Sequence, residues 1–170
     1  MDHFARLGLP AALELEPAAL DRAYFALQRQ WHPDRFANRP ADERARASTE
    51  AAALNDAYRT LKDPLSRAVY LAELRGVELP GDGRTIDDPD LLMEAMEVRE
   101  ALQEAATTEA VDGLARQARD DMKKALSGLG SLLLRDDRPA IRKALLRLRY
   151  LDKFAEDARA RRTNLERSRA

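Results

Sequence analysis

Apolar residues in the first third of the chain recur with the period of an α-helix in two separate stretches. The repeating positions are Leu20, Ala23, Tyr24, Leu27 and Trp31 in the first stretch, and Ala47, Ala51, Leu54, Tyr58 and Leu61 in the second. Such spacings place each set on one face of a helix. Pro33 cannot continue the first helix, which we therefore predict to end near Trp31. The loop that runs to about Pro40 is short, so the two helices are expected to return antiparallel as a hairpin.

Proline, glycine and aspartate positions predict two shorter helices around this hairpin. Residues 2–7 can form one helix, which Gly8 ends. Asp63 and Pro64 mark the start of the other, because aspartate caps a helix N-terminus and proline fits the first helical position. Gly76 is a natural C-terminal stop for that helix.

Three more helical stripes follow a segment rich in proline and glycine, Pro80 to Arg84, which is typical of a linker. Asp88 and Pro89 open the first of the three helices. The stripes are Leu91, Ala95, Val98, Leu102 and Ala105, then Val111, Leu114, Ala118, Met122, Ala125 and Leu129, and finally Ile141, Ala144, Leu148, Leu151, Ala155 and Ala158. Three such stripes can close a core between three helices.

These elements predict an all-α protein with two domains. The first domain, with the helical hairpin, is expected at residues 1–76, and a linker at 77–87 joins it to a three-helix bundle at 88–170. We expect the charged tail beyond Arg161 to fray.

Two bundle helices carry more apolar residues than one packing stripe requires. Successive residues of an α-helix are rotated by about 100° around its axis. On this basis Leu92, Met93 and Met96 lie away from the main stripe of the first bundle helix. In the last helix a second row, on the side away from its core stripe, consists of Leu146, Tyr150 and Phe154. One interpretation is that these second stripes pack on the first domain or against each other. We favour this interpretation for Leu146 and Phe154.

For Leu92, Met96 and Tyr150 we favour a surface that binds a partner, because clusters of exposed apolar residues mark interaction sites. Charged and polar neighbours that could form its rim, or could simply be solvated, are Glu97, Arg99, Glu100 and Gln103.

Composition narrows the function classes. The 170 residues carry a net charge of -1, so no overall basic field would attract nucleic acid or an anionic membrane. There is no cysteine, which removes disulfides, thiolate chemistry and cysteine-ligated clusters, and two histidines are too few for a multi-histidine metal site. We therefore expect no cofactor and no metal. No apolar run approaches the roughly 18 residues of a spanning helix, and the N-terminus lacks a signal sequence, so we expect a cytoplasmic protein.

His32, Pro33 and Asp34 stand at the tip of the predicted hairpin and offer an imidazole, a rigid turn and a carboxylate. A simple interpretation is a helix stop signal with the imidazole near the negative end of the helix dipole. The setting favours more than that, because the chain resembles the J-domain, a co-chaperone module that stimulates DnaK-type ATPases. The stretches that carry the resemblance are residues 2–9, 31–35 and 54–64.

The J-domain resemblance implies that a chaperone is bound through His32, Pro33 and Asp34 and through the outward face of the preceding helix. The residues that we place on this outward face are Asp21, Arg22, Phe25, Gln28 and Arg29. In J-domains the face is commonly basic, whereas here Asp21 offsets Arg22 and Arg29, and Phe25 stands where a lysine would be expected. This departure indicates a dedicated chaperone; alternatively the two arginines are merely solvated.

The second domain narrows the resemblance. Residues 91–94, 96–100 and 148–153 look like HscB, the J-type co-chaperone family of iron–sulfur cluster assembly. This resemblance implies an HscA-type chaperone as one partner. It implies an IscU-type scaffold as the other, bound through Leu92, Met93, Met96 and Tyr150, although leucine and phenylalanine would be typical at the last two positions. The lack of cysteine fits a protein that delivers the scaffold without ligating its cluster.

The resulting hypothesis is a co-chaperone without catalytic activity, in which Asp34 accepts a pair of hydrogen bonds from a chaperone arginine. One rival is an enzyme that uses His32 and Asp34 as acid and base, which would require a pocket with converging polar groups. Other rivals are a J-protein with an unrelated client and a plain helical adaptor.

Overall fold

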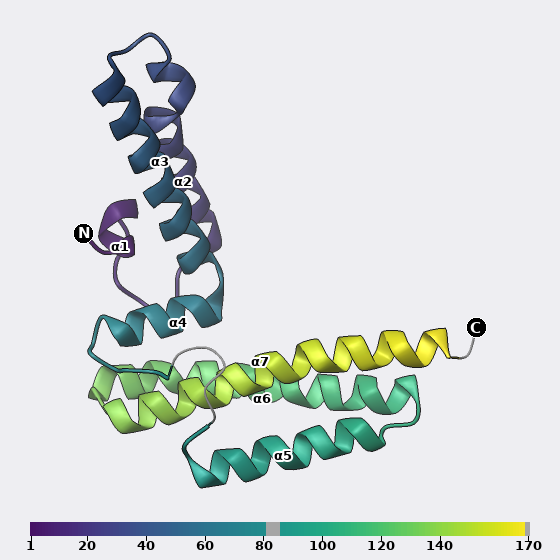
Figure 1. Cartoon of the computed structure of the whole chain (residues 1–170). Helices are drawn as coiled ribbons and strands as arrows, with labels where there is room; N and C mark the ends of the chain where they lie inside the picture. The colour runs from purple at the N-terminus through teal and green to yellow at the C-terminus, as the bar shows by residue number, and fades with distance from the viewer. Residues whose placement is uncertain (81–85, 169–170) are drawn as a thin grey trace. The chain divides into compact units, whose positions relative to one another are not determined.

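The computed structural model describes residues 1–80 and 86–168, and every regular element within these ranges is a helix (Figure 1). The prediction of an all-α protein is thus confirmed. Residues 81–85, which make up most of the predicted proline- and glycine-rich linker, lie outside the described ranges. The chain divides into two compact units, Met1–Leu71 and Ala72–Ala170, which are described separately.

The first unit is built on the predicted hairpin. Helix α2 (Pro17–Trp31) runs alongside α3 (Ala41–Lys62), and the short helix α1 (His3–Leu7) packs against α3 (Figure 1). The apolar side chains buried in this unit include Phe4, Leu7, Leu20, Ala47, Ala51, Leu54, Ala57 and Leu61. Alanine is frequent on the buried face of α3, so the neighbouring helices can approach it closely.

The predicted caps and stops of the short helices are present. The side chain of Asp2 accepts a hydrogen bond from the Ala5 amide at 2.8 Å and so caps α1. Gly8 ends that helix in the left-handed conformation, with φ of 65°, which glycine adopts without strain. Asp63 accepts from the Ser66 amide at 2.7 Å at the start of α4 (Pro64–Glu73).

The second unit contains α5 (Pro89–Glu104), α6 (Thr108–Arg135) and α7 (Arg138–Arg167). Figure 1 shows the three helices lying side by side, with α6 and α7 in contact along much of their length. A core cluster is formed by Leu102, Ala105, Val111, Ala118, Leu151, Phe154 and Ala158. Leu146 and Phe154 are both buried, and Phe154 belongs to this core cluster of the bundle itself. The row that we placed on the side away from the core stripe therefore does not face away from the packed side of α7.

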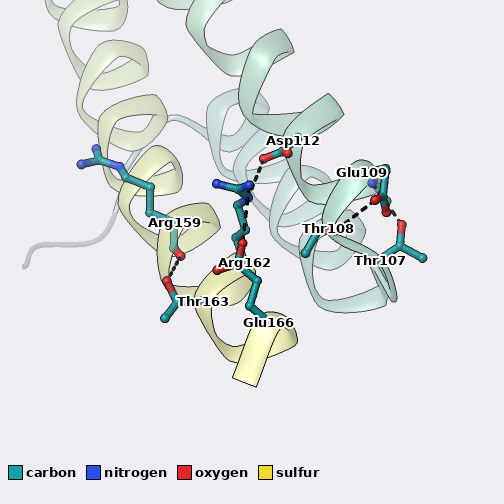
Figure 2. Close-up of polar contacts among 9 residues, drawn as sticks. Thr107, Thr108, Glu109, Asp112, Arg159, Arg162, Thr163 and Glu166 are labelled. Carbon is teal, nitrogen blue, oxygen red and sulfur yellow. Dashed lines mark hydrogen bonds and ion pairs between the residues drawn. The ribbon is translucent and has the colours of Figure 1, made fainter. Parts of the chain in front are cut away.

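The last helix is longer than expected. We expected the tail beyond Arg161 to fray, but α7 continues to Arg167. Leu165 packs against the core cluster, and Arg162 forms ion pairs with Asp112 of α6 at 3.3 Å and with Glu166 at 3.5 Å (Figure 2). The expectation was wrong because it weighed the charge of the tail without the partners that α6 supplies.

None of the helices in the described ranges has a stretch long and apolar enough to cross a membrane.

Candidate functional site

The hairpin tip is fixed by a backbone turn that the sequence itself encodes. His32 leaves α2 in an extended conformation, as a residue before proline prefers. Pro33 then begins a short 3₁₀ helix, η1 (Pro33–Phe36). The amide of Asp34 donates a hydrogen bond to Nδ1 of His32 at 3.3 Å. Nδ1 therefore acts as an acceptor, which places the ring proton of the neutral imidazole on Nε2.

The carboxylate of Asp34 points away from the protein. Its side chain is 91% exposed, and its Oδ2 lies 3.6 Å from Nδ1 of His32. Because the turn holds the backbone while the carboxylate is exposed, both oxygens can accept hydrogen bonds from another molecule.

Four residues that are not among the predicted site residues hold this tip in place, namely Trp31, Arg35, Phe36 and Arg46. A guanidinium nitrogen of Arg35 donates to the carbonyl of Arg29 at 3.0 Å and so satisfies one free carbonyl in the last turn of α2. The ring of Trp31 stacks on Phe36 with 6.0 Å between centroids and 5° between planes. The guanidinium of Arg46, on α3, lies 5.9 Å from the centroid of the Trp31 ring, within cation–π range.

The outward face of α2 is narrower than expected. Two of the residues that we assigned to it, Asp21 and Gln28, turn toward α3 instead. Asp21 accepts a hydrogen bond from the Tyr58 hydroxyl at 2.7 Å, and Gln28 donates to the side-chain oxygen of Asn55 at 2.7 Å. Helix periodicity missed this because both residues lie at the edge of the face, where a tyrosine and an asparagine of α3 are within reach.

The remaining members of the face, Arg22, Phe25 and Arg29, are exposed. Arg22 lies 3.5 Å from the carboxylate of Glu16, and both side chains of that pair are largely exposed.

The second candidate surface lies on α5. Leu92 is 37% exposed, and Met93 and Met96 are each 62% exposed. Their predicted polar neighbours Glu97, Arg99, Glu100 and Gln103 are exposed as well. We call Leu92, Met93 and Met96 the α5 patch.

Tyr150, which we grouped with this patch, is only half-exposed. It packs against the core cluster of the bundle. Its hydroxyl is buried, and that burial raises the pKa of the phenol. The nearby Glu94 carboxylate raises this pKa further. The side chain therefore divides between the core and the surface.

A row of ion pairs joins the beginning of α5 and the segment before it to α7. Asp87 pairs with Arg142 at 2.6 Å and Glu94 with Arg147 at 2.5 Å. Lys143 lies between these pairs, 3.1 Å from Asp88. The acidic and basic residues keep nearly the same offset along the chain, so the two helices run parallel in register.

Hydrogen bonds and nearby cations lower the pKa values of two of these carboxyl groups. The hydrogen bond from Arg142 lowers the pKa of Asp87. The pKa of Asp88 is lowered first by the hydrogen bond from the Leu91 amide, which Asp88 caps, and then by Lys143. Both carboxylates therefore remain ionised to lower pH than ordinary aspartates.

A helical hairpin with an exposed His-Pro-Asp turn, followed by a separate bundle of helices, defines a class: J-domain proteins with a helical C-terminal domain. Comparison with known families agrees with this class. Residues 2–70 match the DnaJ domain, and residues 87–159 match the family described as the HSCB C-terminal oligomerisation domain.

Individual relatives are similar over nearly the whole chain. A co-chaperone protein HscB homolog of Cupriavidus taiwanensis is 44% identical over 159 residues, which cover 92% of this chain and 90% of the relative. The solved structure of chaperone HscB from Vibrio cholerae is 33% identical with a TM-score of 0.84, covering 97% of this chain and 99% of that one. The crystal structure of human co-chaperone protein HscB is 30% identical with a TM-score of 0.87, covering 94% of this chain and 81% of that one. The chain belongs to the HscB family of J-domain co-chaperones.

Proposed function

We propose that this co-chaperone stimulates the ATPase of an HscA- or DnaK-type chaperone and delivers an IscU-type iron–sulfur scaffold to it. The observation that carries the proposal is the exposed Asp34 carboxylate on a turn held by its own backbone. In this scheme the chain acts in the cytoplasm and makes or breaks no bond itself.

At the chaperone-binding surface, Asp34 accepts a bidentate pair of hydrogen bonds from an arginine of the chaperone. Such charge-assisted pairs need a carboxylate with both oxygens free and a fixed direction. Pro33 and the hydrogen bond between the Asp34 amide and His32 hold the backbone from which this carboxylate projects. Arg22 and Arg29 extend the surface along α2. Binding then raises the hydrolysis rate by favouring one conformation of the chaperone, which is a coupling between two sites.

At the scaffold-binding surface, the α5 patch supplies apolar area. Methionine side chains are flexible and polarisable, so Met93 and Met96 can adapt to an irregular partner surface. The exposed part of the Tyr150 ring adds to this area, and Glu97, Arg99 and Glu100 provide the polar rim. Holding the scaffold on the same chain as the hairpin tip raises its effective concentration at the chaperone.

The test is Asp34→Asn, which keeps the shape of the side chain and removes its charge. ATPase measurements with a purified HscA-type chaperone of the same organism should show stimulation by the natural chain and none by the variant. A matched control is Asp42→Asn, because Asp42 is an exposed carboxylate in the first turn of α3. Stimulation that survives in Asp34→Asn would remove the hairpin tip from the mechanism.

A further inference from the structure

Phe25 is a large apolar side chain left exposed in the middle of α2. Within residues 1–71, all of which are described, the exposed large apolar residues are the terminal Met1 and Phe25, which is 54% exposed. The other large apolar residues of α2 are buried or half-buried. An aromatic ring on an otherwise polar face needs an explanation, because solvated helix faces are normally built from charged and polar residues.

The ring lies on the same side of α2 as the hairpin tip. Arg22, Phe25, Arg29 and His32 follow one another at intervals of three or four residues, which places them within an arc of about 80° at about 100° per residue. Phe25 precedes His32 by seven residues, or about 10 Å along the helix axis at about 1.5 Å per residue. A molecule that reaches Asp34 along α2 therefore also covers the Phe25 ring.

The ring is supported from behind by other aromatic residues. Its centroid lies 5.2 Å from that of Tyr24, and Tyr24 stacks on Tyr58 of α3 at 4.1 Å. The Tyr24 hydroxyl also donates to the side-chain oxygen of Asn55 at 2.8 Å. A supported aromatic ring has few conformations to lose on binding, which makes it a good anchor for a partner.

The charges around the ring are already engaged within the protein. Asp21 accepts from Tyr58, and Arg22 pairs with Glu16. The Nε of Arg29 donates to the Phe25 carbonyl at 3.3 Å, so this guanidinium folds back onto its own helix. A partner that docks here gains more from covering the ring than from attracting these charges.

We propose that Phe25 is the specificity-determining contact of the chaperone-binding surface, and that the chaperone meets it with an apolar socket rather than with an acidic patch. The inference rests on the proposed function, which supplies the chaperone as the partner. One ring is far too small to hold a second copy of the chain, since stable interfaces bury on the order of 800 Å² per partner. Its place beside the hairpin tip makes it part of that larger docking surface.

Two substitutions at this position separate the two kinds of partner surface. Phe25→Ala removes the ring, whereas Phe25→Lys replaces it with a cation that an acidic patch would attract. The measurement is the concentration of each variant that gives half-maximal stimulation of the purified HscA-type chaperone, together with the maximal rate. Leu134→Ala is the matched control, because Leu134 is an exposed apolar side chain of α6.

We expect both variants to require about tenfold or more protein for half-maximal stimulation, as for the loss of a central anchor, with the maximal rate unchanged. The control should behave as the natural chain. Circular dichroism should show unchanged helix content, since the side chain is exposed. Tighter binding by Phe25→Lys, or unchanged binding by Phe25→Ala, would overturn the inference.

Failure of this inference is distinguishable from failure of the proposed function. If Asp34→Asn abolishes the maximal rate while Phe25→Ala leaves binding unchanged, the apolar contact alone is wrong. If Asp34→Asn has no effect, the proposed function itself is wrong.

Discussion

The hairpin tip and the α5 patch are two candidate surfaces built in different ways. The tip is polar, and residues close to it in the chain hold it: Pro33 sets the turn, and Arg35 reaches back to the carbonyl of Arg29. The patch is apolar, and its helix is held by ion pairs to residues of α7 more than 50 positions away in the chain, such as Glu94 with Arg147. An exposed carboxylate on a held backbone turn suits recognition of one arginine, whereas a row of flexible apolar side chains suits an irregular surface.

The largest effect is expected from substitutions in the α5 patch. Replacing Leu92 and Met96 together by alanine should weaken scaffold binding by about 2 kcal/mol or more, because truncation of central apolar anchors typically costs that much. Stimulation of the chaperone in the absence of scaffold should not change. Titration calorimetry with a purified IscU-type scaffold measures the loss, and Leu134→Ala again serves as the control. Natural affinity in the double variant would mean that these exposed side chains bind nothing.

The support of the patch can be tested without touching the patch. Glu94→Gln should lower the free energy of unfolding by about 0.5–1 kcal/mol, the range of a partly exposed ion pair, and should weaken scaffold binding slightly. Urea unfolding measures the first effect and calorimetry the second. The double variant Glu94→Arg with Arg147→Glu restores an opposite-charge pair and should recover part of both losses. If it recovers neither, pairing of charge is not what holds α5 at this point.

Acid pH gives the smallest expected effect. The pKa values of Asp87 and Asp88 are lowered in the folded protein, so their contribution to stability is fully present above about pH 4, the ordinary aspartate value. It is lost as the pH falls through their lower folded pKa values. The double variant Asp87→Asn with Asp88→Asn should therefore differ from the natural chain in midpoint of urea unfolding at pH 6 and converge with it below about pH 4. A difference that stays constant over this range would contradict the assignment.

The contrast also explains how much could be predicted from the sequence. Trp31, Pro33 and the spacing of apolar residues predicted the end of α2 and the position of the tip, because caps and prolines act on their immediate neighbours. The same reasoning placed Leu92, Met93 and Met96 on the outer side of α5, and all three are exposed.

What the sequence did not show depends on contacts between helices. Asp21 was placed outward because the periodicity of one helix gives no information about neighbouring helices. The Tyr58 hydroxyl of α3 lies 2.7 Å from the Asp21 carboxylate. Tyr150 was grouped with the patch, but it is partly buried and packs against the core cluster of the bundle. The tail was expected to fray because it is charged. Its ion pair between Arg162 and Asp112 was not foreseen, since Asp112 lies 50 residues earlier in the chain. The acidic residues around the start of α5 and the basic residues of α7 have matching spacings in the sequence. This spacing could have predicted the ion pairs between the two helices, but we made no such prediction.

We propose that one chain carries both surfaces and so joins the scaffold to the chaperone. The direct measurement is retention of a labelled IscU-type scaffold on an immobilised HscA-type chaperone in the presence of the chain. The natural chain should retain the scaffold, whereas Asp34→Asn and the Leu92→Ala, Met96→Ala double variant should each fail, and so should an equal mixture of the two. Retention by the mixture at the level of the natural chain would contradict the claim, because the two surfaces would then work without being joined.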